Sequence, residues 1–347
     1  MSHDPRRLTA LGWNGSLESA FVDAATVAGL RGLVVRVDGP VVTVVTEVGT
    51  DRVPLASPLA GSPDHGGVTT GDWLVVDDGV AVRLLPRRSV LMRRAAGVAT
   101  VGQAVAANID IVFVTVALGV AIRLRRIERA LAMAWSSGAT PVVLLTKSDL
   151  SVDLTGDLRS ARSVAAGAEV VAVNAAGEGV ARVRALLPPG SVAVLVGPSG
   201  TGKSTLVNRL TGSEMLATGE VRSDGKGRHT TTRRELIELP EGGLIIDTPG
   251  TRELGLWDAG AGIEEVFGDL TEVAANCRFR NCRHENEPGC AVRAAAADDP
   301  SVLARLESKR KLEREQERLD SARDLRALAD RRRELRKRAR AIRNATG

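Results

Sequence analysis

The sequence predicts a multidomain α/β protein with a small β-barrel, a parallel sheet covered by helices, and a cysteine-rich segment that precedes a charged C-terminal helix. Three observations predict this fold class. Short β-rich runs with Asp-Gly turns fill residues 30–94, buried apolar strands alternate with helical stretches from about residue 108, and all three cysteines lie within 277–290. With 347 residues and 44% hydrophobic content, the chain can bury a sizeable core in more than one domain.

The expected domains are an N-terminal extension, a barrel, an α/β domain and a metal-binding domain with a basic helix, over residues 1–29, 30–98, 99–266 and 267–347. The apolar run from Ile111 to Ile122 is shorter than the roughly 18–20 residues that cross a bilayer, so no membrane span is expected. The first residues lead into no apolar signal region, and three cysteines do not suit a disulfide scaffold. We therefore expect a cytoplasmic protein.

The barrel is predicted from strands at Leu33–Val37, Val41–Val45 and Trp73–Leu85, the last interrupted by an Asp-Gly turn. Such a unit fits a five-stranded OB-fold barrel, and an SH3-like barrel has a similar pattern. The 30 residues before it are weakly determined by their sequence.

The α/β domain is predicted from apolar strands that are separated by helical stretches. These strands are expected at Ile109–Val116, Val142–Leu145, Val170–Val173, Val192–Val196 and Leu244–Ile246. In such parallel sheets, ligands bind beyond the carboxyl ends of the strands.

The C-terminal segment carries the basic character of the chain. Residues 305–347 contain sixteen Lys or Arg and eight Asp or Glu, a net charge of +8, whereas the whole chain carries +5 and the remainder −3. This asymmetry favours a polyanionic partner, nucleic acid rather than membrane, and an aromatic content of 2% means that phosphate contacts carry most of the binding. The alternative is a solvated, salt-bridged helix. The helix has a thin apolar stripe and is therefore expected to lie on the surface or to dock on a partner; the stripe comprises Leu303, Leu306, Leu312, Leu319, Leu325 and Leu328.

A glycine-rich loop follows the strand at 192–196 and fits the pattern G-x-x-x-x-G-K-[ST]. Its glycines let backbone N–H groups face phosphate oxygens, and the next helix adds its positive N-terminus. We expect Lys203 to contact the β and γ phosphates and Ser204 to bind Mg²⁺. The predicted nucleotide-binding residues of this loop are Gly197, Pro198, Ser199, Gly200, Thr201, Gly202, Lys203, Ser204 and Thr205.

Two further positions complete the phosphate side of the site. Asp247 ends an apolar strand, where its carboxylate suits the Mg²⁺ shell, and Gly250 offers an N–H that can sense the γ-phosphate.

The base-recognition side is predicted from Thr146-Lys147-Ser148-Asp149, which follows a buried strand and resembles the [NT]-K-x-D motif of GTPases. The Asp149 carboxylate can accept hydrogen bonds from guanine N1 and the 2-amino group, which adenine cannot offer. The stem of Lys147 would lie along the nucleotide, and Thr146 stands where Asn is commoner. Asn174 follows another strand and resembles the loop that supports guanine from the other side.

The order of these motifs is unusual, because the guanine motif precedes the phosphate loop. A circularly permuted chain keeps the same sheet if the old termini are joined near residues 187–190. The segment after Gly250 then leads almost directly into the C-terminal part of the chain. The exchange of one bound nucleotide for another could therefore move that part like a lever.

The metal-binding module is predicted from Cys277, Cys282, His284 and Cys290. Three thiolates and one imidazole form a closed tetrahedral set, typical of one structural Zn²⁺ ion with no open catalytic position.

These motifs together resemble the ribosome small-subunit-dependent GTPases of the RsgA (YjeQ) type. The resemblance rests on the permuted order and on residues 227–232 (GRHTTT), 247–257 (DTPGTRELGLW) and 276–292, and residues 71–73, 87–89 and 103–110 extend it toward the barrel. It implies an OB-fold barrel, a permuted GTPase domain and a zinc domain. It also implies GTP hydrolysis stimulated by the 30S subunit in its late maturation, with 16S rRNA and the 30S particle as partners of a monomer.

The resemblance also implies roles for residues near the γ-phosphate. One of Thr230 to Thr232 would be the switch-one ligand of Mg²⁺, and Thr231 and Thr232 both remain candidates. Thr251 stands where Ras-like proteins place a water-orienting Gln, so intrinsic turnover should be slow. His229 resembles the catalytic His of the family and would act with Lys203, or it contacts rRNA instead.

Two other functions remain open at this point. The first alternative is an RNA-binding module in which the nucleotide is only a stabilising ligand. The second is a GTPase that is coupled to another partner, a protein complex or a membrane surface. The complete set of Lys203, Ser204 and Asp247 argues against the first, and the zinc module and basic tail argue for RNA over a protein or membrane partner.

Overall fold

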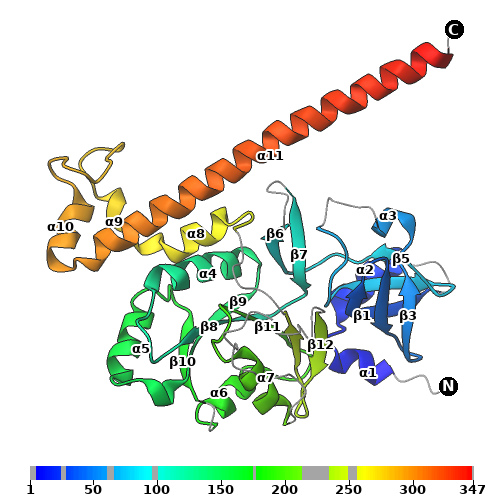
Figure 1. The fold of residues 1–347 in the computed structure, drawn as a ribbon, viewed down its shortest axis with the longest axis horizontal. Coiled ribbons are helices and arrows are strands. Elements are labelled where there is room, and N and C mark those ends of the chain that lie inside the picture. The colour runs from blue at the N-terminus through cyan, green and yellow to red at the C-terminus, as the bar shows by residue number, and fades with distance from the viewer. Residues whose placement is uncertain are drawn as a thin grey trace, which may run out of the picture.

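The structure is a computed structural model that describes residues 5–24, 29–60, 66–95, 101–174, 177–212, 234–248 and 256–345. A small β-barrel lies on one side, a mixed sheet between helices forms the centre, and a helical module with a long C-terminal helix lies above the sheet (Figure 1). In the described residues, no helix is long and apolar enough to cross a membrane.

The barrel is built from five short strands and closes on itself. Strand β1 (Leu30–Asp38) pairs antiparallel with β2 (Val41–Val45) and with β4 (Trp73–Asp77). Strand β2 pairs with β3 (Thr50–Pro54), and β4 pairs with β5 (Val80–Leu84). A parallel bridge from Leu55 to Ala81, next to the short helix α3 (Ser57–Ala60), joins the end of β3 to β5. The strand order around the barrel is therefore β1-β2-β3-β5-β4, and alternate valines fill its interior.

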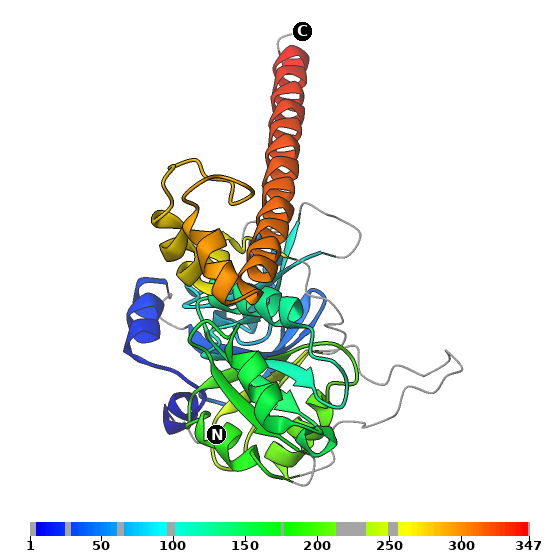
Figure 2. The ribbon, with the colours of Figure 1, turned by 90° about the vertical axis from the view of Figure 1, so that its left-hand side faces the viewer.

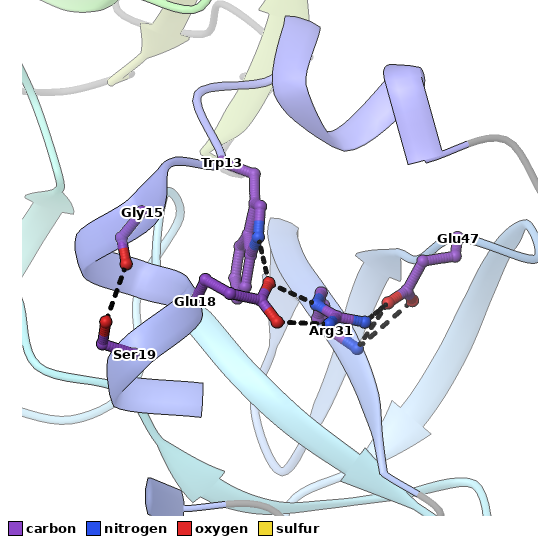
Figure 3. Close-up of polar contacts among 6 residues, drawn as sticks. All are labelled: Trp13, Gly15, Glu18, Ser19, Arg31 and Glu47. Carbon is purple, nitrogen blue, oxygen red and sulfur yellow. Dashed lines mark hydrogen bonds and ion pairs between the residues drawn. The ribbon is translucent and has the colours of Figure 1, made fainter. Parts of the chain in front are cut away.

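The first residues form two helices, α1 (Pro5–Ala10) and α2 (Gly15–Ala24), that pack on the barrel, although the sequence determined them only weakly. Arg31 of β1 holds α2 in place, because its guanidinium lies 2.7 Å from Glu18 of α2 and 2.8 Å from Glu47 (Figure 3). Trp13 donates its indole N–H to Glu18 at 2.9 Å. The guanidinium also lies 4.6 Å from the ring centroid of Phe21, so a cation–π contact adds to the ion pairs.

A hairpin and a buried polar joint connect the barrel to the central sheet. The hairpin consists of β6 (Val90–Arg94) and β7 (Gly102–Ala107), and its connection contains the predicted boundary at residues 98/99. Asp72 is fully buried and binds Arg87 through both carboxylate oxygens, at 2.7 and 2.8 Å. Asn108 donates to the carbonyl oxygen of Gly71, whose φ of +91° brings the backbone so close to Ala107 that a Cβ would lie 2.2 Å from its carbonyl oxygen. Gly71-Asp-Trp73 and Arg87-Arg-Ser89 thus form the joint itself.

The central sheet has the order β10-β9-β8-β11-β13-β12, and β12 continues into the barrel by pairing with β1. Five strands of this sheet are parallel and confirm the five predicted strands. They are β8 (Ile111–Ala117), β9 (Thr140–Thr146), β10 (Glu169–Val173), β11 (Val192–Val196) and β13 (Leu244–Asp247). The sequence did not predict β12 (Glu235–Glu238), which runs antiparallel to β13.

Helices cover both faces of this sheet because alternate strand residues point to opposite sides. On β8, Val112 and Val114 join the core beneath α4 (Leu124–Ser136), α5 (Leu154–Arg162) and α8 (Gly260–Val266). Phe113 points to the other core, which is covered by α6 (Val180–Ala185) and α7 (Lys203–Thr211).

The C-terminal part consists of α9 (Gly268–Ala275), α10 (Ala291–Asp298) and the 45-residue helix α11 (Ser301–Ala345). The first half of α11 docks on the chain itself: Leu312 and Leu319 are buried with α4, and Arg129 of α4 binds Glu315 at 2.6 and 2.8 Å. Leu325 and Leu328 are exposed, and the end of the helix projects from the body (Figure 2). The expectation of a helix that lies wholly on the surface or on a partner is therefore wrong for its first half.

Candidate functional site

The predicted nucleotide-binding residues meet at one edge of the central sheet. The carboxyl ends of the parallel strands β9, β10, β11 and β13 carry Thr146, Asn174, the glycine-rich loop and Asp247, respectively. Because α7 begins directly after the loop, its N-terminal N–H groups face this edge.

The glycine-rich loop has a backbone that requires glycine at several positions. Gly197, Gly200 and Gly202 have φ values of +148°, +81° and +82°, which other residues rarely adopt. A Cβ on Gly197 would lie 2.3 Å from the hydroxyl oxygen of Thr115 on β8. The spacing of the glycines is therefore set by the turn and by the neighbouring strand.

Threonine hydroxyls brace the loop from beneath. The Thr115 and Thr201 hydroxyl oxygens lie 2.8 Å apart, and the Thr115 hydroxyl donates to the Val196 carbonyl oxygen at 3.0 Å. Thr146 is buried, and its hydroxyl lies 2.7 Å from the carbonyl oxygen of Thr201. The first residue of the guanine motif is thus tied directly to the phosphate loop. Sequence analysis missed Thr115, whose only signal was a hydroxyl within an apolar strand.

Lys203, the first residue of α7, donates from its ammonium to the carbonyl oxygens of Gly197 and Pro198 at 2.8 and 2.7 Å. Burial lowers the pKa of Lys203, and the carboxylate of Asp247 opposes that shift. Burial likewise raises the pKa of Asp247, which Lys203 opposes. A cation and a carboxylate that share a water-poor environment suit a ligand composed of phosphate and a divalent cation.

Ser204 and Asp247 are the described residues that fit Mg²⁺. Ser204 lies in the first turn of α7, and Asp247 ends the adjacent strand β13. The two residues offer only a few hard oxygen donors. Such a set suits Mg²⁺, which keeps several bound waters and also binds phosphate oxygens.

The predicted guanine side lies beyond β9. Lys147 has a φ of +55° and begins a single 3₁₀ turn, Ser148–Leu150, that carries the exposed carboxylate of Asp149. The side-chain oxygen of Asn174 accepts from the N–H groups of Gly177 and Glu178, at 2.9 and 3.1 Å. Asn174 therefore stabilises the loop that it begins.

Five residues of the predicted site lie outside the described part of the chain. They are His229, Thr230, Thr231, Thr232 and Gly250.

The cysteine-rich segment brings together all four predicted metal ligands. The ligand atoms of Cys277, Cys282, His284 and Cys290 lie within 4.8 Å of one another. Nδ1 of His284 lies 3.6 Å from Sγ of Cys277 and 3.5 Å from Sγ of Cys290, and these two sulfurs are 4.0 Å apart. A tetrahedral Zn²⁺ ion with bonds of about 2.0–2.3 Å separates its ligand atoms by roughly 3.5–3.8 Å, so the cluster has the size that zinc needs.

Local structure explains why these four side chains converge. Cys290 is the N-cap of α10, and its Sγ accepts from the N–H of Arg293 at 3.5 Å. His284 has a φ of +56°, and Gly289 has a φ of +74°, which turns the chain back toward Cys277. In a segment with so little apolar packing, a bound metal would supply much of the folding free energy.

Comparison with known proteins relates this architecture to one family. The model of the RsgA GTPase family matches residues 84–257. A Streptomyces coelicolor protein named "Small ribosomal subunit biogenesis GTPase RsgA" is 45% identical over 95% of this chain and 92% of its own. The crystal structure of YjeQ from Thermotoga maritima is similar with a TM-score of 0.58 and 25% identity, over 82% of this chain and 97% of its own. That of YloQ, described as a circularly permuted GTPase, has a TM-score of 0.55 and 20% identity, over 82% and 94% of the two chains, and supports the fold alone.

Proposed function

This chain belongs to the RsgA GTPase family and is a GTP-hydrolysing enzyme, and from that premise we propose that the small ribosomal subunit stimulates its hydrolysis of GTP late in the maturation of that subunit. The observation that carries the proposal is the 45% identity, along almost the whole chain, to a protein named for small-subunit biogenesis. Binding of the 30S particle would occur through 16S rRNA, by a monomer in the cytoplasm.

The nucleotide is proposed to lie along the edge from the phosphate loop to the 3₁₀ turn. Residues 197–205 would bind the phosphates, with Lys203 moving from its two carbonyl partners to the β and γ phosphates. Asp149 would read guanine, flanked by Lys147 and by the loop that Asn174 shapes. Since Thr146 is hydrogen-bonded to Thr201, binding of the base and of the phosphates would be mechanically linked.

Mg²⁺ is proposed to be held by Ser204 and a switch threonine, Thr231 or Thr232, with Asp247 in its shell. When bound, it would neutralise charge on the β and γ phosphates. The N–H of Gly250 would sense the γ-phosphate, and His229 would accept a proton from the attacking water or orient it.

The remaining parts are proposed to recognise RNA. The barrel order β1-β2-β3-β5-β4, closed by the bridge between Leu55 and Ala81, supports its assignment as an OB fold, a frequent single-strand-binding module. We assign one structural Zn²⁺ ion to Cys277, Cys282, His284 and Cys290. The domain limits proposed from the sequence, 1–29, 30–98, 99–266 and 267–347, are retained.

The experiment that tests this function is GTP hydrolysis at substoichiometric enzyme with and without purified 30S subunits. The 50S subunit and ATP serve as controls for the particle and the base. Strong stimulation by 30S alone is expected. Tight GTP binding without stimulation would refute the ribosome-coupled function and favour a GTPase with another partner, or an RNA-binding module stabilised by nucleotide.

The role of His229 is tested by His229→Ala in the same assay. Loss of stimulated turnover with unchanged 30S binding is expected for a catalytic residue. Unchanged stimulated turnover would remove the catalytic assignment, and weakened 30S binding would identify an rRNA contact instead.

A further inference from the structure

Two arginines contact neighbouring residues of strand β7 in the hairpin β6–β7, and neither has an acidic partner among the described residues. Arg234, the residue before β12, is partly buried and donates from Nη1 to the carbonyl oxygen of Ala104 on β7 at 3.2 Å. Arg93 of β6 donates from Nε and Nη2 to the side-chain oxygen of Gln103, at 3.2 and 3.0 Å. Both guanidinium groups therefore contact adjacent residues of β7, and within the described part of the chain their hydrogen-bond acceptors are neutral.

This arrangement differs from that of other enclosed arginines in the chain. Arg87 binds the buried carboxylate of Asp72, and Arg305 binds Asp269 at 3.0 Å. At Arg234, burial and the nearby charge of Arg93 lower the pKa of the guanidinium to about 10. Because a partly buried guanidinium that has only neutral acceptors among the described residues is costly, an anion that binds these two side chains would be favoured.

We propose that Arg93 and Arg234 together form a binding site for a phosphate group. Guanidinium forks match phosphate oxygens in pairs, and the side-chain amide of Gln103, whose oxygen already binds Arg93, leaves N–H donors for the same ligand. The phosphate comes either from an RNA backbone or from the terminal phosphate of the bound nucleotide.

The position of Arg234 gives this site a consequence for catalysis. It follows residues 213–233, which contain the proposed switch-one threonines, and it precedes Glu235, which pairs with Asp247 across β12 and β13. A phosphate bound by Arg93 and Arg234 would connect the hairpin β6–β7 to the residue that directly follows residues 213–233. The RNA alternative rests on the proposed function, whereas the existence of the site does not.

Thermal unfolding with inorganic phosphate tests the site directly. The protein is first saturated with GDP and Mg²⁺ so that the phosphate loop is filled, and phosphate is compared with KCl at equal ionic strength. Arg93→Gln, Arg234→Gln and the double variant are compared with Arg182→Gln, a control that removes an arginine paired with Glu169 on the far side of the sheet. Phosphate should raise the Tm of the wild type and the control, and this increment should vanish in the double variant. An equal increment in all proteins would overturn the proposal.

Two binding measurements then identify the source of the phosphate. If it is RNA, the double variant binds 30S subunits about tenfold more weakly, and the slope of log affinity against log [KCl] falls by about one per lost contact. If it is the nucleotide, affinity for a non-hydrolysable GTP analogue falls about tenfold relative to GDP, and 30S affinity at a saturating analogue concentration is unchanged. No change in either measurement would overturn the assignment of the phosphate to RNA or to the nucleotide. A wild type that 30S fails to stimulate would refute only the proposed function, because the phosphate titration contains no ribosome.

Discussion

The joint between α4 and α11 depends on a buried ion pair between Glu128 and Arg305. Glu128 is only 1% exposed, and its Oε1 lies 3.4 Å from Nε of Arg305. The same guanidinium donates to the carbonyl oxygen of Val266 at 3.0 Å and binds Asp269. Arg305 therefore connects α11 to α4 and, through Asp269, to α9.

We expect Arg305→Met to lower the free energy of unfolding by about 3–5 kcal/mol, because it leaves the Glu128 carboxylate buried without its cation. Most of this loss arises from the orphaned charge, since Asp269 is 60% exposed and gains little from the pair. The double variant Arg305→Met with Glu128→Gln should therefore recover much of the loss. The expected coupling between the two sites is about 1–3 kcal/mol.

The pH dependence provides an independent check. Burial raises the pKa of Glu128, although Ser308 and Arg305 oppose the shift. Without Arg305 the pKa should rise further. A carboxyl group whose pKa is higher in the folded state stabilises the fold while it is protonated, and that stability is lost as the pH rises through the folded-state pKa. The deficit of Arg305→Met should thus be small near pH 5 and grow toward pH 8.

Urea denaturation followed by tryptophan fluorescence measures these effects, because Trp135 lies on α4 and Trp257 lies 4.6 Å from the guanidinium of Arg323 on α11. Arg318→Met, which removes an exposed cation from the same helix and leaves the contact of Arg323 with Trp257 intact, is the control. A cost below about 1 kcal/mol for Arg305→Met, or no recovery with Glu128→Gln, would refute the reasoning.

Four further outcomes are expected. Lys203→Ala should reduce GTP turnover at least about a hundredfold, measured by phosphate release, because it removes the loop's cation; near-normal turnover would exclude its assigned role. Asp149→Asn should weaken GTP binding about tenfold or more in equilibrium dialysis without creating ATP binding, and retained affinity would contradict the base assignment. Metal analysis should find one equivalent of zinc in the wild type and none in Cys282→Ser, whereas an equal zinc content in both proteins would place the ion elsewhere. Arg31→Met should cost about 1–2 kcal/mol and expose α2 to proteolysis, because the nearly buried Glu47 loses its partner; equal protease resistance would show that the aromatic contacts suffice.

The sequence predicts best what is encoded within a few consecutive residues. The phosphate loop and the four metal ligands are contiguous motifs whose chemistry tolerates few substitutions, and the apolar strands are runs long enough to stand out. The hydroxyl of Thr115 was missed because its partner, Thr201, lies 86 residues away. Contacts over such distances have no local pattern.

The same limit explains the two ends of the chain. Helix α2 is anchored by Arg31, and the two acidic partners of Arg31 lie 13 and 16 residues away in opposite directions. In α11, the predicted leucine stripe is buried at Leu306, Leu312 and Leu319. It could not reveal that this face covers α4 of the same chain, because the ion pair that fixes the docking joins residues 186 apart.

In the proposed function, residues 213–233 and 249–255 carry the groups assigned to the γ-phosphate and Mg²⁺, and circular permutation connects these two segments to different parts of the chain. Residues 213–233 lead into Arg234 and β12, and β12 pairs with β1 of the barrel through Arg36 and Glu235. Residues 249–255 lead toward Trp257, which contacts Arg323. The N–H of Ala259 donates to Gln316 at 2.9 Å. One segment thus ends on the barrel and the other on α11, which projects from the body (Figure 2). If the proposed RNA binding engages the barrel and α11 together, it would act on the described residues at which both segments end, and these residues connect directly to the proposed switch residues in sequence.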